Sequence, residues 1–192
     1  MIRRIIENNI AGKKVLIFFI LSTTIYLIML LFTIPRVMSY SGGMKILDMM
    51  PTGYDAAYVN ELFAKLGEPG RHAYLFGQIP FDMVYPALYG IGFCLVLAWF
   101  LKKLGRLHGF LIYFCLLPII AGFFDYCENF GIIAMMQAFP EIPVNLVAVT
   151  NIFSVLKSSL TSIFFIVLVV VLIMFAIRLL SQKQIKVNRN IN

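Results

Sequence analysis

Four long apolar stretches constrain the fold of this chain more than any other feature. They cover roughly residues 14–34, 79–101, 109–137 and 143–177 of a 192-residue sequence. About 20 apolar residues in a helix cross a hydrocarbon core of ~30 Å, so each stretch is long enough to span a bilayer. Transmembrane β-strands would appear instead as segments of about ten alternating residues. The sequence therefore predicts an all-α, polytopic membrane protein built as a four-transmembrane-helix bundle.

Composition favours a membrane protein without a separate soluble part. Hydrophobic residues make up 61% of the chain and charged residues 13%, values outside the range of soluble domains. We therefore expect residues 1–192 to form a single membrane domain. The first apolar stretch is as long as a full span and no A-x-A cleavage site follows it, which predicts a retained helix rather than a signal peptide.

Basic residues gather on one side of the predicted spans. They are Arg3, Arg4, Lys13, Lys14, Lys102, Lys103, Arg106, Arg178, Lys183, Lys186 and Arg189. Because such residues remain on the cytoplasmic side, both termini are predicted to be cytoplasmic in a prokaryotic plasma membrane. The net charge of +7 follows from this asymmetry. Attraction to anionic lipid headgroups explains the charge, and we expect membrane lipids rather than nucleic acid as partners.

The cysteines and histidines predict neither a redox site nor a metal centre. Cys94, Cys115 and Cys127 fall inside apolar stretches without a C-x-x-C pair, which favours a packing role. His72 and His108 lie on opposite predicted sides of the membrane, so they cannot share one metal ion within a chain. We expect no cofactor and no metal, while a cation site made only of carboxylates stays open.

Residues 35–78 form the one long segment outside the predicted spans. Capping-box spacing ending at Asp55 predicts the start of an amphipathic helix over about residues 53–66, and Gly67 can supply its left-handed stop. We expect this helix to lie on the outer surface. Two interpretations stay open: the helix is a surface anchor that closes the bundle, or it is a lid that brings Arg71 to the mouth of a pocket.

Four charged residues interrupt the apolar stretches, and we expect them to meet. They are Asp82, Asp125, Glu128 and Lys157. Counting from the basic side at ~1.5 Å per residue gives all four a similar depth of about 25 to 31 Å. This depth corresponds to the outer edge of the hydrocarbon. Equal depth on three separate spans predicts one shared polar site.

Helical phase adds neighbours to this site. Tyr85 and Tyr89 fall on the face of Asp82, where Pro86 is expected to kink the helix and free a backbone carbonyl. Asn129 falls on the acidic face of the next span. Hydroxyl and amide side chains flank the lysine of the last span, and such a stripe should face the bundle interior, because an ionised group costs about 2.5 to 3.5 kcal/mol at the bilayer centre.

Three carboxylates and one ammonium leave two negative charges unbalanced. Arg71 joins the cluster, a carboxyl holds a proton, or a cationic ligand completes it. We therefore expect an acidic pocket near the outer leaflet that binds or passes a small cationic or amphipathic ligand. The expected ligand-binding residues are Arg71, Asp82, Tyr85, Tyr89, Asp125, Glu128, Asn129 and Lys157.

Other roles stay open at this point. A membrane-embedded, lipid-modifying enzyme would use one carboxyl as acid and another as base, without metal or cofactor, although the sequence identifies no catalytic residue. A structural or assembly subunit would use the same charges only to hold its helices in register. Homo-oligomerisation also stays open.

The polar motifs resemble those of a known group of proteins. Gly67 to Tyr74, then Asp82-Met-Val-Tyr-Pro86 with Tyr89-Gly90, then Asp125-Tyr-Cys-Glu128-Asn129 resemble a family of small, uncharacterised four-span prokaryotic membrane proteins. The resemblance covers most of the chain. That family has no established activity, so it transfers no catalytic residue. In architecture alone, the expected bundle is similar to the sterol-isomerase and sigma-2 receptor family, whose acidic residues face a cavity in the membrane.

Overall fold

The apolar stretches fold as four long helical segments. The computed structural model describes the backbone of residues 2–191 and the side chains of residues 4–182. Helices account for 84% of the structure, and no strand occurs in the described part of the chain. The segments long and apolar enough to cross a membrane are Gly12–Tyr40, Ala56–Lys103, Leu111–Ala138 and Val144–Gln182. The predicted all-α class and the number of long apolar helices are confirmed.

Each segment is built from one or more helices. The first contains α2 (Gly12–Ile28), a π-helical turn (Met29–Thr33) and α3 (Ile34–Tyr40), and it follows the short α1 (Ile2–Asn9). The second contains α4 (Ala56–Ala73), another π-helical turn (Tyr74–Gln78) and α5 (Ile79–Lys103). The third contains α6 (Leu111–Phe114) and α7 (Leu117–Ala138), and the fourth is α8 (Val144–Ile191).

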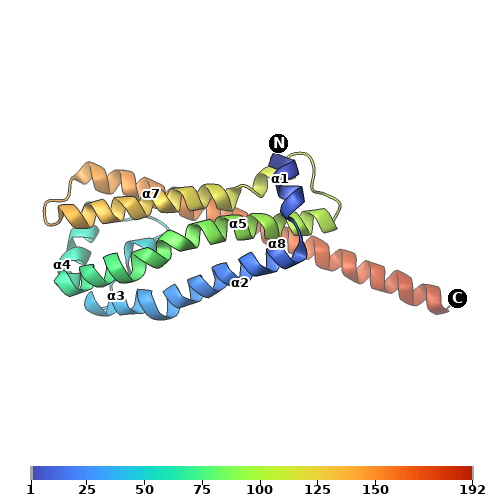
Figure 1. Ribbon diagram of the computed structural model, residues 1–192, viewed down its shortest axis with the longest axis horizontal. Helices are drawn as coiled ribbons and strands as arrows, with labels where there is room; N and C mark the ends of the chain where they lie inside the picture. Colours follow the sequence, from blue (N-terminus) through green and yellow to red (C-terminus); the bar gives the residue numbers. More distant parts are fainter. Residues whose placement is uncertain (1, 192) are drawn as a thin grey trace.

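The helices pack in the order α2, α5, α7, α8. Helix α5 contacts α2 on one side and α7 on the other, and α7 packs along α8. Figure 1 shows both termini at one end of the bundle, with the α5–α6 connection beside α1, and α4 at the opposite end. We call these the termini end and the α4 end. The side chains of Arg3, Lys183, Lys186 and Arg189, part of the predicted basic side, lie outside the described residues.

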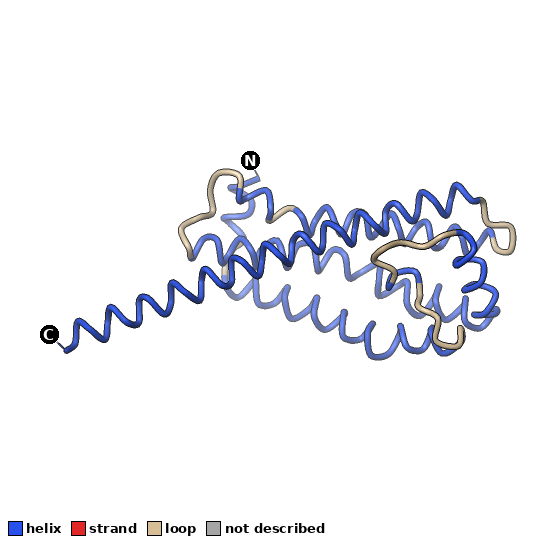
Figure 2. The backbone as a smooth tube through the Cα atoms, turned by 180° about the vertical axis from the view of Figure 1, so that it is seen from behind, coloured by secondary structure: helices blue, strands red, loops and turns tan. Residues whose placement is uncertain are grey.

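The segment predicted as a long outer loop over residues 35–78 is mostly helical. Helix α3 extends to Tyr40, and the connection to α4 shrinks to residues 41–55, the longest loop in Figure 2, which contains one 3-10 turn (Leu47–Met49). Asp55 caps α4 by accepting a hydrogen bond from the Tyr58 amide at 2.8 Å. Gly67 interrupts α4 with φ at 61°, but the helix resumes after it, because Pro69 fits the first turn of a new helical stretch.

Helix α4 packs against the bundle through one apolar face. Leu62 and Phe63 are fully buried, and Phe63 contacts Phe139 edge to face with ring centroids 6.1 Å apart. Ile132 and Met135 of α7 belong to the same core. The predicted amphipathic helix therefore closes the α4 end of the bundle through buried contacts.

Two Pro-x-x-x-Gly pairs bring α5 and α7 close together. A Cβ atom at Gly122 would lie 2.8 Å from the Pro86 carbonyl oxygen, and one at Gly90 would lie 3.1 Å from the Pro118 carbonyl oxygen. Each glycine therefore lets the backbone of one helix approach the proline turn of the other. This close contact positions the acidic residues of α5 and α7 side by side.

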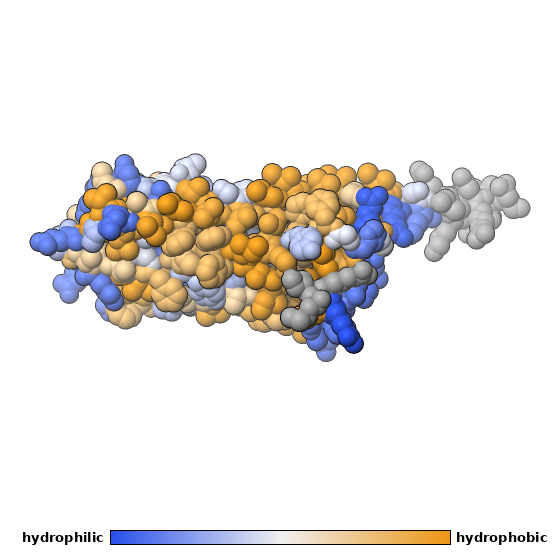
Figure 3. All heavy atoms as spheres, turned by 90° about the horizontal axis from the view of Figure 1, so that it is seen from above, coloured by the Kyte–Doolittle hydropathy of each residue, from blue (hydrophilic) through white to orange (hydrophobic). Residues whose placement is uncertain are grey.

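The outer surface of the bundle is apolar between two hydrophilic ends. Figure 3 shows this surface in orange, with hydrophilic residues in blue gathered toward the ends. Phe32 on the first segment, Phe123 on α7 and Ile166 on α8 are 67%, 62% and 65% exposed. Large apolar side chains that point outward suit a hydrocarbon environment, because water would penalise them.

Candidate functional site

A cluster of charged side chains lies inside the bundle. The Lys157 ammonium of α8 donates to Asp125 Oδ1 of α7 at 2.9 Å and forms a second ion pair with Glu128 Oε2. Asp82 of α5 is 3% exposed, and Glu128 is fully buried. The four charges singled out from the sequence therefore come together from three helices.

Asp48 adds a fourth carboxylate that sequence reasoning missed. It belongs to the loop before α4, and its Oδ2 accepts a hydrogen bond from the buried Tyr74 hydroxyl at 2.6 Å. The loop folds inward because Ile46 and Leu47 are fully buried. The signal was present in the sequence: an acid flanked by apolar residues in a loop predicts that the loop is covered.

Several polar atoms of the cluster have no hydrogen-bond partner. Asp48 Oδ1, Asp82 Oδ2 and the amide nitrogen of Gln78 are buried and unpartnered, and Gln78 is fully buried. Buried polar atoms in folded proteins are nearly always satisfied, so unsatisfied ones indicate a missing water, ion or ligand. Four carboxyl groups against a single ammonium also leave a larger surplus of negative charge than the sequence alone indicated.

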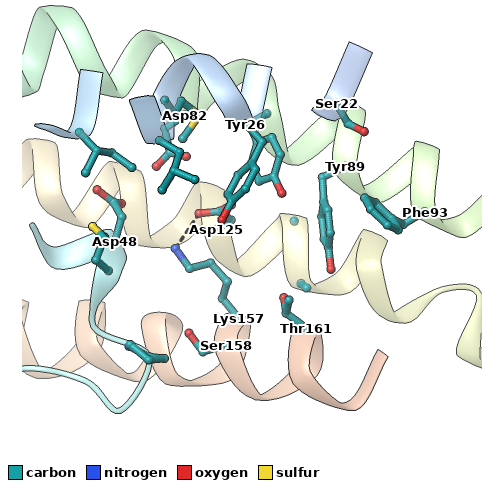
Figure 4. Close-up of a pocket in the computed structure, with 18 of the residues that line it drawn as sticks. Ser22, Tyr26, Asp48, Asp82, Tyr89, Phe93, Asp125, Lys157, Ser158 and Thr161 are labelled. Atoms are coloured by element: carbon teal, nitrogen blue, oxygen red, sulfur yellow. Dashed lines mark hydrogen bonds and ion pairs between the residues drawn. The ribbon is translucent and has the colours of Figure 1, made fainter. Parts of the chain in front are cut away.

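A cavity of about 540 Å³ adjoins this cluster. Figure 4 shows α2 and α5 on one side of the cavity and α8 on the other, with α7 between them. Its charged lining residues are Asp48, Asp82, Asp125 and Lys157. The volume is within the range of about 300–1,000 Å³ that is typical of small-molecule sites.

Aromatic rings line the cavity from its charged part toward the termini end. Ring centroids are 5.8 Å apart for Tyr26 and Tyr85, 5.5 Å for Tyr85 and Tyr89, and 5.1 Å for Tyr89 and Phe93. Phe165 of α8 follows, 5.5 Å from Phe93. Tyr26 was not among the predicted residues, because the first apolar stretch has no charge to mark an inner face. The cavity is therefore acidic at one end and aromatic at the other.

Five of the eight predicted site residues line the cavity. They are Asp82, Tyr85, Tyr89, Asp125 and Lys157. Glu128 does not line the cavity but pairs with Lys157, which does. Its place is that of a buried counter-ion.

Asn129 has a local role that the sequence did not predict. Its amide donates to the backbone carbonyl of Asp82 at 3.0 Å. This carbonyl is the one that Pro86 leaves free, since proline has no N–H to donate four residues along the helix. The predicted free carbonyl therefore exists, and Asn129 satisfies it instead of lining the cavity.

Arg71 does not join the acidic cluster. Its guanidinium donates to the Phe63 carbonyl at 2.8 Å and lies over the Phe139 ring, 4.6 Å from the ring centroid. This contact fixes α4 to the α7–α8 connection. Arg71 therefore neither supplies the missing positive charge of the cluster nor lines the cavity. Tyr74, at the C-terminal end of α4, does reach the cluster, through its hydrogen bond to Asp48.

The loop before α4 covers the cluster at the α4 end. The Tyr54 amide donates to Asn151 Oδ1 of α8 at 2.8 Å, which attaches the loop to that helix. Burial, then the nearby Glu128 and Asp48 carboxylates, raise the pKa of the Tyr54 phenol well above its usual value, so its hydroxyl stays neutral. The loop before α4 therefore closes the cluster at the α4 end with neutral, mostly apolar residues.

No metal-binding arrangement is found among the described side chains: no three His, Cys, Asp or Glu residues could hold an ion together. The three cysteines are free thiols. Cys94 and Cys115 are buried in the apolar core of the termini end. They pack there, away from the acidic cluster.

Comparisons with known protein families, with curated proteins and with solved structures find no match to this chain. The resemblance to small four-span prokaryotic membrane proteins therefore stays a prediction. Any functional conclusion depends on the geometry of the cavity.

Proposed function

We propose that the chain is a multi-pass protein of a prokaryotic plasma membrane, with both termini in the cytoplasm. The apolar outer surface and the four long apolar helices support insertion. The basic side chains at the termini end support the orientation. In this arrangement α4 lies at the outer surface, and the acidic part of the cavity faces the outer leaflet.

We further propose that the cavity binds, or passes, a small cationic or amphipathic ligand. One observation carries this proposal: Asp82 lines the cavity although it is only 3% exposed and has an oxygen without a hydrogen-bond partner, in a cluster where acids outnumber the one lysine. A cation at this point would supply both the missing hydrogen bond and the missing charge. Asp48 and Asp125 would complete its charged surroundings.

The aromatic wall supports the same ligand class. Tyr85 and Tyr89 lie between the acidic and apolar parts of the cavity. Their ring faces can attract a cation, and their hydroxyls can accept or donate a hydrogen bond. Lys157 would tune the site by neutralising Asp125 while leaving Asp82 for the ligand.

Whether Asp82→Asn raises or lowers the stability of the free protein distinguishes a binding role of Asp82 from a purely structural one. In Asp82→Asn, we expect the free protein to become more stable by roughly 1 kcal/mol or more, because a buried acid beside Asp48 and Asp125 is removed. Binding of hexylamine, followed by calorimetry in a neutral detergent, should weaken at least about tenfold, since a charge-assisted hydrogen bond of about 1.5–3 kcal/mol is lost.

Glu141→Gln is the matched control. It removes the same charge from an exposed residue, so neither binding nor stability should change. If Asp82→Asn lowers stability and wild-type protein binds no hexylamine, the network is structural and the proposal fails. Turnover of extracted lipids by the purified protein, without amine binding, would instead favour the enzyme hypothesis.

A further inference from the structure

The cavity has a side opening between α2 and α8. Both helices line it, through residues such as Tyr26 and Ser158, yet across the described chain α2 makes no extended contact with α8. Tyr26, Leu30 and Phe165 line the cavity and are still 44%, 37% and 40% exposed. The opening is therefore directed at the apolar side of the bundle rather than at either hydrophilic end.

We propose that this opening admits a single-chain amphipathic amine directly from the bilayer, with the amine bound among Asp48, Asp82 and Asp125 and the alkyl chain lying between α2 and α8. This inference rests on the proposed function and names its ligand class and route. It adds to cation binding the requirement for an alkyl chain.

The lining changes along the cavity in the way this ligand requires. The acids lie toward the α4 end, while Phe93 lies further along α5 toward the termini end (Figure 4). Phe165, which follows Lys157 along α8, lies against Phe93. Ser22 and Thr161 add only small hydroxyl groups between them. A head with positive charge fits the first part, and a hydrocarbon chain fits the second.

The charges exclude a phosphate in the head. Lys157 is the one basic side chain among the described residues that line the cavity, and two carboxylates already neutralise it. A phosphate placed beside the three cavity carboxylates would be repelled, whereas an ammonium would be attracted. Asp82 and Gln78, both at least nine-tenths buried, line this region, and each has a side-chain atom without a hydrogen-bond partner.

A tryptophan at the opening provides the test. Trp99 is the one tryptophan of the chain and lies near the termini end, so Tyr26→Trp in a Trp99→Phe background reports on the opening alone. In vesicles of brominated phosphatidylcholine, acyl chains at the opening should quench this tryptophan. Dodecylamine should displace them and restore fluorescence with saturation, at an amine mole fraction about tenfold lower than in the same protein carrying Asp82→Asn.

Three controls decide the result. Dodecanol, which has the chain without the charge, should restore no fluorescence at the same mole fraction, and lysophosphatidylethanolamine should restore none because of its phosphate. Ile166→Trp, on the exposed outer face of α8, should stay quenched throughout. Leu30→Trp is a second reporter at the opening, to be used if Tyr26→Trp does not fold.

The outcomes separate this inference from the proposed function. Hexylamine binding that depends on Asp82, together with no response of either reporter to dodecylamine, would overturn the side route and leave cation binding intact. Equal responses to dodecylamine and dodecanol would overturn the amine assignment. A response to lysophosphatidylethanolamine equal to that of dodecylamine would overturn the exclusion of phosphate.

Discussion

Lys157 supplies the positive charge on which the acidic cluster depends. Its ammonium contacts Asp125 and Glu128, while Asp48 and Asp82 face the cavity without an ammonium of their own. The side chains are therefore of two kinds. Asp125 and Glu128 share the one ammonium, whereas Asp48 and Asp82 form no ion pair with it.

Removing the lysine should destabilise the protein strongly. In Lys157→Met, two buried carboxylates lose their counter-ion, and we expect the free energy of unfolding to fall by about 3–5 kcal/mol. Denaturant unfolding in a neutral detergent measures the change. Lys65→Met is the control, because Lys65 forms an exposed pair with Glu61 at 2.7 Å and should contribute less than about 1 kcal/mol. Equal losses of unfolding free energy in the two variants would show that the buried ion pairs stabilise the protein no more than the exposed pair does.

Asn129 and Pro86 should be energetically coupled. Asn129→Leu removes the donor to the carbonyl that Pro86 leaves free, and we expect it to cost about 1–3 kcal/mol. In a Pro86→Ala background the helix supplies its own donor, so the same change should cost about 1 kcal/mol less. A double-mutant cycle on unfolding free energies measures this coupling, and equal costs in both backgrounds would contradict it.

At the residue scale, sequence reasoning found the charges that stand out against apolar surroundings. Asp82, Asp125 and Lys157 were identified because an ionisable residue within a span must face other polar groups. Arg71 was assigned wrongly, since its partners are a backbone carbonyl and an aromatic ring. Sequence spacing cannot distinguish such partners from a carboxylate, because they are present along the whole chain.

A close backbone contact between α5 and α7 positions the acids. Gly122 and Gly90 lie against the carbonyls of Pro86 and Pro118, respectively. This reciprocal arrangement was not predicted, although both Pro-x-x-x-Gly spacings are visible in the sequence. Which glycine meets which proline depends on how antiparallel helices align, and a single sequence does not specify that alignment.

Filling this contact should separate the two helices. In Gly122→Ala, the new methyl would lie 2.8 Å from a backbone oxygen that cannot rotate away, and we expect a loss of about 1–3 kcal/mol. Thermal unfolding in detergent measures it. Gly77→Ala is the matched control, since nothing lies within 4 Å of the position that its methyl group would take and alanine favours helix. A Gly122→Ala protein as stable as Gly77→Ala would contradict the close contact.

The connection before α4 shows why element boundaries were the weaker part of the prediction. Apolar residues at Ile46 and Leu47 draw the loop onto the bundle, and this places Asp48 in the cavity. The sequence predicted a helix over about residues 53–66 that stops at Gly67, whereas α4 begins after its N-cap Asp55 and continues past the break at Gly67 to Ala73. The capping acid and the break at the glycine were recognised, because both depend on local backbone chemistry. The course of the loop depends on contacts with distant helices.

At the scale of the whole molecule, charge and apolar surface define two different ends. Exposed Lys45 lies in the loop beside α4, and exposed Arg106 lies in the α5–α6 connection at the opposite end. Apolar periodicity and basic flanks predicted this arrangement directly. The sequence could not predict that α2 and α8 stay apart, because an apolar helix face can pack equally well against lipid or against another helix.

Cysteine labelling should establish the orientation. In a variant without the three native cysteines, Lys45→Cys should react in intact cells with a maleimide that does not cross membranes, because the proposed orientation places the basic termini end in the cytoplasm. Arg106→Cys should react only after the cells are opened. The reverse pattern would contradict the proposed orientation, and labelling of both in intact cells would contradict a membrane-spanning bundle.

A density map of the protein in lipid nanodiscs, prepared with dodecylamine, would show whether the cavity holds an amphipathic amine. We expect elongated density that begins among Asp48, Asp82 and Asp125 and leaves the bundle between α2 and α8, with Lys157 still on Asp125 and Glu128. A map in which α2 packs onto α8 over an empty cavity, or in which the three carboxylates point away from one another, would contradict the account.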